Sequence, residues 1–456
     1  MAIPRVTQEQ AVLRRAAHKA HVDNAPEALQ AYATYLAQVP NDAAIWSNLG
    51  ALHRKQGRYL QALRAQERAQ RIAPDDVGLR NNYANILSDL GHYKASIAAR
   101  RWILEHNPDD VTQKSMIARC LRGQGHYLGA IEYLETVIPD HPEDTELQMQ
   151  LAFAQLGAGQ YNQAFQTYRV RWDTEELKRH DQPFPEWDGQ SLAGKTILVL
   201  PEQGFGDAIL FMRFLPALKA LGATVWVLTE KPVYPLFSKL EGADWVGTSL
   251  GKDAPVDCWI NMMDMAAIHF AQTDKIPAPT KLQIPAIAHD RAAAIVAPYQ
   301  DAFKVGVIWS GSVTYKGNGF RSFSHTDFLP LADIAGVQLF SLYKGPALAA
   351  YEADGSDAFI INAAASERNF GDNAAMMEQM DLVISSDTAT AHLAGSLGVP
   401  TWTILHWDPF WVWRHAGDTT DWYPNMRLFR QTSALAWTDV LTEVGTALRA
   451  KIGDRA

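Results

Sequence analysis

A period of 34 residues runs through the first part of the chain and constrains its fold more than any other feature. Glycine recurs at this step, each time two residues before a tyrosine, at Gly57, Gly91, Gly125 and Gly159. Proline keeps the same step at Pro40, Pro74, Pro108 and Pro142. A small residue falls in phase at Ala28, Ala62, Ser96, Ala130 and Ala164. Three residue types with one period predict stacked copies of a single structural unit.

Each copy is predicted to be a pair of antiparallel helices. Glycine suits the turn between the helices, the small residue lets them pack closely, and proline ends the second helix. Because one hairpin cannot bury its apolar face alone, the copies are expected to stack into an α-helical superhelix with a concave groove. The segment 43–76 resembles the tetratricopeptide repeat nearly throughout, and four clear units start at Ala43 after a degenerate one. The resemblance implies that the repeats bind a peptide or a protein.

Three carboxamides mark a candidate acceptor peptide groove. Asn48 and Asn82 stand one period apart, and Gln150 lies three periods beyond Asn48. A carboxamide offers both a donor and an acceptor, so it can clamp an extended peptide backbone. In tetratricopeptide repeats joined to protein O-glycosyltransferases, asparagines at this place line the groove. Solvated or capping side chains would account for the same residues.

The repeat signal ends near residue 178, and a different pattern follows a linker predicted over 179–194. Beyond it, apolar strands such as "TILVL" and "KVGVIWS" alternate with helical segments. This alternation predicts parallel α/β units. We expect two Rossmann-like halves, over 195–285 and 286–456, with a cleft between them. Ligands of such sheets bind beyond the carboxyl ends of the strands, so the site is expected in that cleft.

The first candidate stretch, "PEQGFGDAIL", joins the strand at 196–200 to a helix. Gly204 and Gly206 would let the backbone approach a ligand, and Asp207 stands at the start of the helix. Aspartate is a common helix N-cap, so the spacing alone leaves open whether Asp207 caps the helix or does chemistry.

The second stretch, "SSDTATAHLAGSLGVP", follows the apolar run "DLVI". A helix starting near Thr388 would present free backbone N–H groups and the positive end of its dipole to an anion. Thr388 and Thr390 add hydroxyl donors, and His392 lies one turn along the same side. The alternative is a capped helix with Asp387 as N-cap.

The third stretch, "VIWSGSVTYKGNGFRSFSHTDF", brings a loop and a cation to a strand end. The strand ends at Ser310, Gly311 opens the loop, and Arg321 or Lys316 could neutralise a diphosphate. Taken singly, each cation is more often a solvated surface charge.

Together these stretches and "DWYPNMRLFRQ" resemble the bacterial glycosyltransferases that carry tetratricopeptide repeats and a heptosyltransferase-like GT-B domain. The plan is similar to that of O-GlcNAc transferases, and some relatives glycosylate flagellin. The resemblance implies that Asp207 is the general base of an inverting transfer. It also implies that Thr388 and Ala389 bind the donor diphosphate with His392, and that Asp387 holds the turn.

The same resemblance assigns the remaining donor residues. Arg321 occupies the place of a cation near the phosphates, and the loop at Ser310 and Gly311 would cover the donor. Tyr343 and Lys344, which end "LFSLYKG", sit where relatives contact the base. Relatives commonly have glutamine in place of Tyr343, so the base stays open, and the donor is an ADP-, UDP-, GDP- or CMP-linked sugar.

Composition limits the remaining choices. A net charge of -9 gives no basic footprint for nucleic acid, and two distant cysteines predict neither a disulfide framework nor a thiolate metal site. The chain contains no Asp-x-Asp motif, which favours leaving-group stabilisation without a metal or other cofactor. No signal-peptide segment or apolar run of membrane-spanning length is apparent, so a soluble, cytoplasmic protein is expected.

These patterns predict an inverting, metal-independent GT-B glycosyltransferase that uses a nucleotide sugar. The repeats would hold a protein acceptor, plausibly flagellin, and the sugar would pass to a Ser or Thr hydroxyl. One alternative is a transferase of the same fold that acts on a glycolipid or saccharide acceptor. The other is a non-catalytic repeat adaptor with a degenerate transferase fold.

Overall fold

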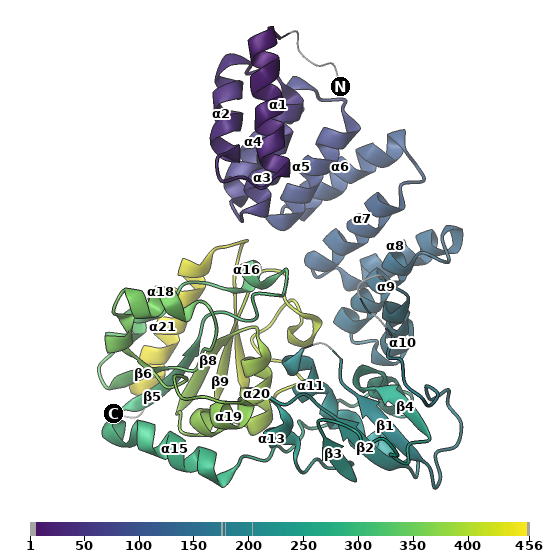
Figure 1. Cartoon of the computed structure of the whole chain (residues 1–456), viewed down its shortest axis with the longest axis vertical. Coiled ribbons are helices and arrows are strands. Elements are labelled where there is room, and N and C mark those ends of the chain that lie inside the picture. Colours follow the sequence, from purple (N-terminus) through teal and green to yellow (C-terminus); the bar gives the residue numbers. More distant parts are fainter. Residues whose placement is uncertain (1–5, 175–176, 178, 203, 454–456) are drawn as a thin grey trace. The chain divides into compact units, whose positions relative to one another are not determined.

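A computed structural model describes residues 6–174, 177, 179–202 and 204–453 of the chain. By its contacts the chain forms two compact units, Met1–Ala154 and Gln155–Ala456. The expected fold class is confirmed, because paired helices are followed by two parallel sheets covered by helices (Figure 1). Residue 178, the predicted end of the repeats, lies outside the described residues. The last helix of the repeat pattern groups with the second unit.

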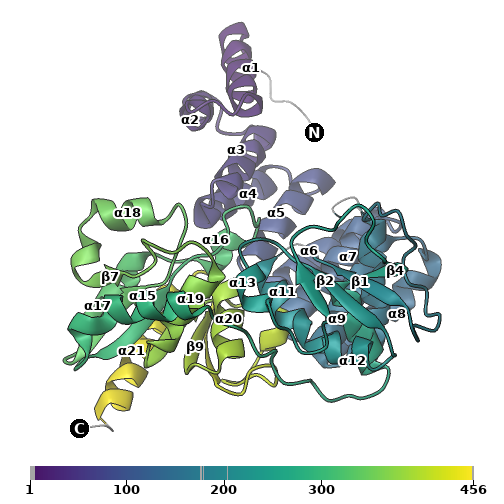
Figure 2. The ribbon, with the colours of Figure 1, turned by 60° about the horizontal axis from the view of Figure 1, so that its bottom comes forward.

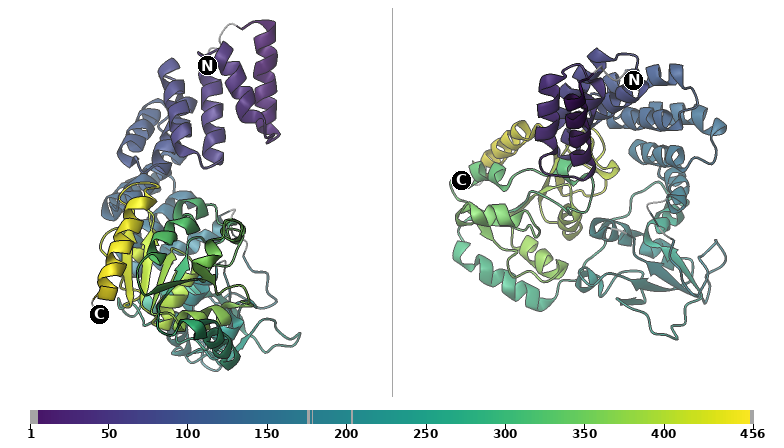
Figure 3. Two further views of the ribbon diagram at one scale, coloured as in Figure 1. Left: turned by 90° about the vertical axis from the view of Figure 1, so that its left-hand side faces the viewer. Right: turned by 45° about the horizontal axis from the view of Figure 1, so that its top comes forward.

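The first unit consists of helical hairpins, which the purple-to-blue ribbon of Figure 3 shows as antiparallel pairs. Its helices are α1 (Gln8–Val22), α2 (Ala28–Gln38), α3 (Ala43–Lys55), α4 (Tyr59–Ile72), α5 (Val77–Asp89), α6 (Tyr93–His106), α7 (Val111–Gly123) and α8 (Tyr127–Val137); α9 (Thr145–Ala158) crosses the boundary between the units. The periodic glycines end the first helix of each pair with φ between 71° and 78°. Glycine is favoured there because this left-handed region strains other residues.

Aspartate is a further periodic residue, and it precedes the first helix of the four pairs that start at α3, α5, α7 and α9, whereas Thr7 caps α1. Its side chain accepts a hydrogen bond from the backbone N–H three residues on, at 3.2 Å for Asp42, 3.0 Å for Asp76, 3.2 Å for Asp110 and 2.8 Å for Asp144. Each bond satisfies a donor that the helix start would leave unpaired. The small in-phase residues are buried between the helices, as Ser96 and Ala62 show with no exposed surface.

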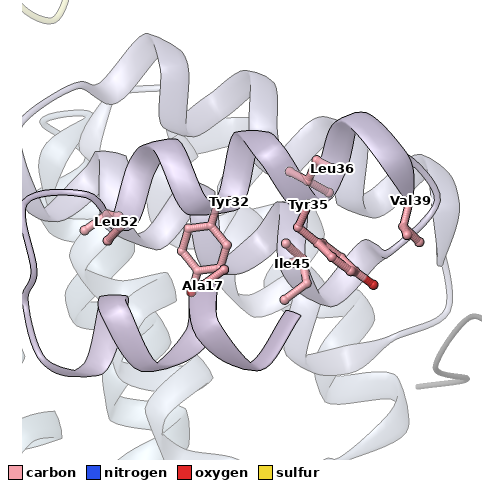
Figure 4. Close-up of a cluster of buried hydrophobic side chains, with 8 residues drawn as sticks. Ala17, Tyr32, Tyr35, Leu36, Val39, Ile45 and Leu52 are labelled. Atoms are coloured by element: carbon pink, nitrogen blue, oxygen red, sulfur yellow. The ribbon is translucent and has the colours of Figure 1, made fainter. Parts of the chain in front are cut away.

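The first hairpins share one apolar core, drawn in Figure 4. Tyr32 and Tyr35 of α2 lie in this core fully buried, beside Ala17 of α1 and Ile45 of α3. Tyr35 also donates a hydrogen bond of 2.9 Å to Asp42. The hairpins are therefore joined by aromatic packing as well as by repetition.

The second unit contains two parallel sheets. The first sheet has the order β3-β2-β1-β4, and the second has the order β10-β9-β8-β5-β6-β7. The strands are β1 (Thr196–Leu200), β2 (Thr224–Leu228), β3 (Trp245–Gly247), β4 (Cys258–Asn261), β5 (Phe303–Ile308), β6 (Val337–Ser341), β7 (Ile360–Asn362), β8 (Leu382–Ser386), β9 (Thr401–Leu405) and β10 (Met426–Arg430). The strand order reverses at β1, which lies between β2 and β4, and at β5, which lies between β6 and β8. Where the strand order of a parallel sheet reverses, a crevice opens at the carboxyl ends of the strands.

Helices cover both sheets. Those of the first half are α11 (Phe205–Phe211), α12 (Leu215–Lys219), α13 (Tyr234–Phe237) and α14 (Met265–Phe270). Those of the second half are α15 (Ala286–Val296), α16 (Asn318–Arg321), α17 (Leu329–Ala332), α18 (Leu348–Ala353), α19 (Phe370–Glu378), α20 (Ala389–Leu397) and α21 (Trp437–Gly453). Among the described residues no helix is both long and apolar enough to cross a membrane.

The two halves meet where α11 packs against α20, as Figures 1 and 2 show. A Cβ atom on Gly206 would lie 3.0 Å from Cδ2 of His392 and 3.1 Å from Cα of Ala389. This approach is tighter than an ordinary Cβ contact, so Gly206 lets the two helix starts come together. The second and first candidate stretches are thus neighbours.

The last helix of the repeat pattern, α10 (Tyr161–Thr167), is built into the second unit. Tyr161 accepts a hydrogen bond of 3.1 Å from Nε1 of Trp422, and Phe165 stacks on Phe270 with ring centroids 5.6 Å apart. Trp411 packs against both rings of α10. Trp411, Trp413 and Trp422 are all buried, so these tryptophans belong to the core of the second unit.

Part of the predicted linker also joins the first sheet. Trp187 donates its backbone N–H to the carbonyl of Trp259 at 2.8 Å, and Trp259 donates to Pro185 at 3.0 Å. These bonds place the segment alongside the edge strand β4. The segment accordingly covers a sheet edge that would otherwise be open.

Candidate active site

Asp207 occupies the first turn of α11 and does not cap it. The helix starts at Phe205, and the N-cap position belongs to Gly204, whose φ is 103°. A Cβ atom on Gly204 would collide with the Asp207 carboxylate, so the glycine makes room for this side chain. Between the two roles that the sequence left open, the structure therefore excludes the N-cap and leaves a half-buried carboxylate near the start of a helix.

Burial, together with the negative charges of Glu202 and Asp387, raises the pKa of Asp207 to about 7, while the positive charge of Arg321 opposes this rise. Glu202 follows β1, whereas Asp387 and Arg321 come from the second half. A carboxylate with a pKa near neutrality can both accept and release a proton under physiological conditions.

The start of α20 lies across from this carboxylate. Thr388 is the N-cap residue and is 5% exposed, and its Oγ1 lies 2.6 Å from Oγ1 of Thr390 and 3.4 Å from Oγ of Ser385. Asp387 is buried but does not supply the cap. Ala389 opens the helix and touches Gly206. This helix start offers the backbone donors and dipole that suit a phosphate.

The loop after β5 brings Arg321 to the same place. Oδ1 of Asn318 accepts hydrogen bonds from the backbone of Gly311 at 3.1 Å and from Nε of Arg321 at 3.4 Å. Nδ2 of Asn318 donates to Ser310 at 3.2 Å. A Cβ atom on Gly311 would lie 2.8 Å from Nη2 of Arg321 and 2.9 Å from Cγ2 of Thr388. The backbone at Gly311 therefore packs between Arg321 and the start of α20.

Asn318 was missed by the sequence reasoning. Its only signal in the sequence is its place between two glycines in "KGNGFR", three residues before the candidate Arg321. Because its amide is 9% exposed and bonds three parts of the loop, it holds the loop in shape.

His392 is held as a neutral imidazole at the wall between the halves. Burial, together with the positive charges of Arg213 and Arg321, lowers its pKa to about 3. Its Nδ1 lies 3.0 Å from the Tyr423 hydroxyl, and its ring stacks on Trp413 with centroids 5.0 Å apart. A neutral ring in this position can hydrogen-bond a donor substrate but carries no charge to pair with a phosphate.

Tyr343 and Lys344 differ in their surroundings. The Tyr343 ring is buried and packs on Trp309 with centroids 4.9 Å apart, whereas Lys344 is exposed and its Nζ donates to the backbone oxygen of Glu367. Burial raises the pKa of Glu367 to about 7, although Asn373 donates to it at 2.7 Å. A pocket opens beside these groups, lined by residues of α15, α19 and the strand ends: Ala288, Arg291, Ala292, Ile295, Leu342, Ala363, Ala364, Ser366, Glu367, Asp372, Asn373 and Met376.

The carboxamides predicted for a peptide groove belong to the first unit and make internal hydrogen bonds. Asn82 donates to Oγ of Ser47 at 2.9 Å, and Asn48 bonds the Tyr32 hydroxyl. Gln150 is 5% exposed, accepts from Arg122 at 3.2 Å and donates to Glu146 at 2.8 Å. Asn48 and Asn82 are half-buried, so they are the better placed of the three to meet a peptide.

Comparison with known proteins first defines the class of the helical part. Residues 12–177 match the family model described as tetratricopeptide repeat, so this part of the chain is a tetratricopeptide-repeat region. Residues 41 to the end of MamA from Desulfovibrio magneticus RS-1 are 15% identical to this chain in their solved structure. That similarity covers 39% of this chain and 100% of MamA's, with a TM-score of 0.35.

Two further similarities extend beyond the repeats. Protein FlbA of Caulobacter vibrioides is 26% identical over 319 residues, which are 63% of this chain and 52% of FlbA. The chain thus spans about half the length of this curated relative. The crystal structure of a glycosyl transferase family 9 protein from Veillonella parvula is similar over 57% of this chain and 90% of its own, with 14% identity and a TM-score of 0.42.

Proposed function

We propose that the chain is an inverting glycosyltransferase that moves a sugar from a nucleotide-activated donor to a Ser or Thr hydroxyl of a protein. The observation that carries the proposal is the meeting of two helix starts at Gly206. One bears Asp207, whose pKa is about 7, and the other bears Thr388 beside Arg321. This pairing supplies a base on one side and a site for an anionic leaving group on the other.

In the proposed step, Asp207 takes the proton of the acceptor hydroxyl while that oxygen attacks the anomeric carbon of the donor sugar. The bond between this carbon and the phosphate oxygen breaks, and its electron pair leaves with the nucleotide. Attack from the side opposite the leaving group inverts the anomeric configuration. General-base catalysis of this kind contributes roughly 10²- to 10⁴-fold to a rate.

The leaving nucleotide would be held by the second half. Backbone N–H groups at Thr388 and Ala389 and the dipole of α20 would face the phosphates, and Arg321 would add a positive charge. Ser310 and Gly311 would close over the donor, and His392 would accept or donate one hydrogen bond as a neutral ring. These groups can stabilise the departing charge without a metal, so the proposed reaction is metal-independent and should persist in EDTA.

The base of the nucleotide would lie near Lys344, whose amine stands at the edge of the pocket that contains Glu367. Because the Tyr343 ring packs on Trp309 in the core, we propose that this tyrosine shapes the pocket from beneath. The identity of the base is left to the binding experiment.

The acceptor in this proposal is a protein bound by the repeats, and flagellin is the first candidate to test. Asn48 and Asn82 would hold its backbone. The double variant Asn48→Ala/Asn82→Ala should reduce transfer to protein while leaving donor hydrolysis unchanged. Transfer to a lipid or saccharide with no dependence on these asparagines would favour the alternative acceptor class.

The experiment that tests the proposal uses the full chain and a panel of ADP-glucose, UDP-N-acetylglucosamine, GDP-mannose and CMP-N-acetylneuraminate. Binding is measured by the rise in melting temperature, since a ligand at 100 times its dissociation constant stabilises by roughly 2.7 kcal/mol. Sugar transfer to flagellin is followed by intact mass. Binding of at least one donor and a mass gain that Asp207→Asn abolishes are expected. Binding without any transfer, in the wild-type chain and the variant alike, would favour the non-catalytic adaptor.

A further inference from the structure

Arg171 lies in the short 3-10 helix Tyr168–Asp173, directly after α10, and it is 1% exposed. Its Nε and Nη2 donate to the two carboxylate oxygens of Glu202 at 3.0 and 2.7 Å. Its Nη1 donates to Oδ1 of Asp264 at 2.9 Å. The two carboxylates are themselves 4% and 6% exposed. One guanidinium therefore ties two buried acids from different segments.

The two acids mark the carboxyl edge of the first sheet. Glu202 follows β1 and precedes Asp207 by one short loop, and Asp264 follows β4. β1 and β4 are parallel neighbours, with Leu200 paired to Asn261 at their ends. Both carboxylates therefore lie close together at this edge of the sheet, where their negative charges would repel each other without a cation between them.

The cation comes from outside the α/β half that it serves. Arg171 belongs to the segment that continues the repeat helices, and its guanidinium lies over the rings of Tyr168 and Trp172 at 4.8 and 4.7 Å. The carbonyl of Tyr168 accepts a further hydrogen bond of 3.2 Å from Nη1. All three guanidinium nitrogens thus have partners, and the fork is fixed on every side.

We propose that Arg171 is a positioning residue for Asp207. By holding Glu202 beside Asp264 through hydrogen bonds, it fixes the connection between β1 and α11 and so the position of Asp207 near the start of α20. The inference rests on the proposed role of Asp207 as general base. In this proposal the segment that follows the repeats contributes a residue that the transfer reaction needs.

The two glycines beside Asp207 do little to fix the backbone that leads to it. Gly204 adopts a φ that other residues rarely take, and Gly206 must stay small for contact with α20. Because glycine restricts the backbone less than any other residue, two glycines allow this segment many conformations. The bidentate grip on Glu202 limits that freedom at one end, and α11 limits it at the other.

The base is also electrostatically linked to this cluster. The charges that shift the pKa of Asp207 are those of Glu202, Asp387 and Arg321, and the charge of Asp207 in turn raises the pKa of Tyr168 and Tyr423. Glu202 and Tyr168 are both direct partners of Arg171. A change at Arg171 is therefore transmitted to Asp207 through loop geometry and through the charge on Glu202.

The test compares Arg171→Lys with Arg100→Lys in the full chain. Arg100 is also fully buried, but it lies in α6 of the first unit and bonds the neutral groups of Asn85 and Gln113 at 2.8 and 2.9 Å. Lysine keeps the charge and loses the planar fork that holds both oxygens of a carboxylate. The two variants thus match in chemistry and burial and differ in what the arginine holds.

Three measurements are made on each variant. Hydrogen exchange by mass spectrometry follows peptides that cover 200–211. Calorimetry gives the nucleotide dissociation constant. Hydrolysis of the donor that the wild-type chain accepts gives kcat and KM without relying on the acceptor protein.

Arg171→Lys is expected to speed exchange in the 200–211 peptides and to lower kcat about tenfold or more, since small misplacements of a catalytic group are costly. Nucleotide affinity and donor KM should stay within about twofold. Arg100→Lys should change neither the exchange of these peptides nor kcat. In addition, Glu202→Gln should move the acidic limb of the rate profile to lower pH, because it removes a negative charge near Asp207.

Unchanged exchange in 200–211, or faster exchange with an unchanged kcat, would overturn the inference. A parallel loss of kcat, nucleotide affinity and melting temperature would also overturn it, because that pattern belongs to a residue needed only for folding. If the wild-type chain neither hydrolyses a donor nor transfers its sugar to protein, the proposed function fails instead. Hydrogen exchange alone then tests the positioning role of Arg171. Faster exchange of Arg171→Lys confined to the 200–211 peptides supports this role, and exchange equal to that of the wild type refutes it.

Discussion

The two strand-to-helix junctions that meet at Gly206 are built in opposite ways. The junction from β8 to α20 carries its own hydrogen bonds, since the hydroxyls of Ser385, Thr388 and Thr390 bond one another within a few residues. The junction from β1 to α11 contains two glycines and a carboxylate, and its anchor is an arginine from another part of the chain. A site for a fixed anion can be made locally, whereas a base with a pKa near neutrality needs distant groups to place and tune it.

The largest expected effect separates the chemistry of the two junctions. Asp207→Asn should lower the transfer rate by roughly 10²- to 10⁴-fold, because it removes the proposed proton acceptor. Nucleotide affinity by calorimetry should not fall, since the phosphates are proposed to bind at the other junction. Asp253→Asn, at an exposed position of the same half, is the matched control. A rate that persists in Asp207→Asn would remove this residue from the base role.

The next effect concerns the anion side. Arg321→Met should weaken nucleotide diphosphate binding by roughly 10- to 100-fold, as expected for loss of a hydrogen bond to a charged group. Calorimetry with the nucleotide alone measures this change. Arg449→Met, an exposed arginine of the same half, should bind as the wild type does. Equal affinity in the two variants would show that Arg321 does not contact the phosphates.

A smaller effect is expected from the loop that joins Arg321 to Thr388. Gly311→Ala would place a methyl group 2.8 Å from Nη2 of Arg321 and 2.9 Å from Thr388, so one of them must shift. Gly319→Ala in the same loop meets nothing within 4 Å and is the control. We expect nucleotide binding about threefold to tenfold weaker for the first variant only. Identical affinities would show that the loop geometry at Gly311 does not matter for binding.

The smallest effect is on stability, and its sign depends on pH. The pKa of Asp207 is 3.8 in its ordinary state and about 7 in the fold, so ionisation is disfavoured in the folded protein. The resulting cost to stability is absent below the ordinary pKa and grows as the pH rises to about 7. Asp207→Asn should therefore raise the melting temperature by a few degrees at about pH 8 and by less at about pH 5. A gain that is larger at the lower pH would contradict the raised pKa.

Much of the fold follows from local spacing. The 34-residue period predicts paired helices, and the structure places the periodic glycines in left-handed turns and the small residues between helices. The aspartates keep the same period, but spacing alone does not distinguish a helix cap such as Asp42 from a solvated surface charge, and its bond to the N–H of Ile45 decides the role. Apolar strands that alternate with helical segments likewise predict two parallel α/β halves.

The candidate site was less completely predictable. Asp207, Thr388 and Arg321 stand out because each closes or follows a strand, and the structure brings them together. Asn318 and Arg171 do not stand out, because a loop amide and an arginine near the end of a repeat have no distinctive spacing. Their partners are set by folding and cannot be inferred from neighbours in the chain.

Spacing along the chain was therefore enough to place Asp207 at a helix start and Thr388 at another. Whether Asp207 caps its helix or titrates near neutrality depended on burial and on charges from Glu202, Asp387 and Arg321, which fold around it from separate segments. The physical reason is that backbone turns and caps are short-range, while desolvation and Coulomb interactions act between any groups that packing brings close.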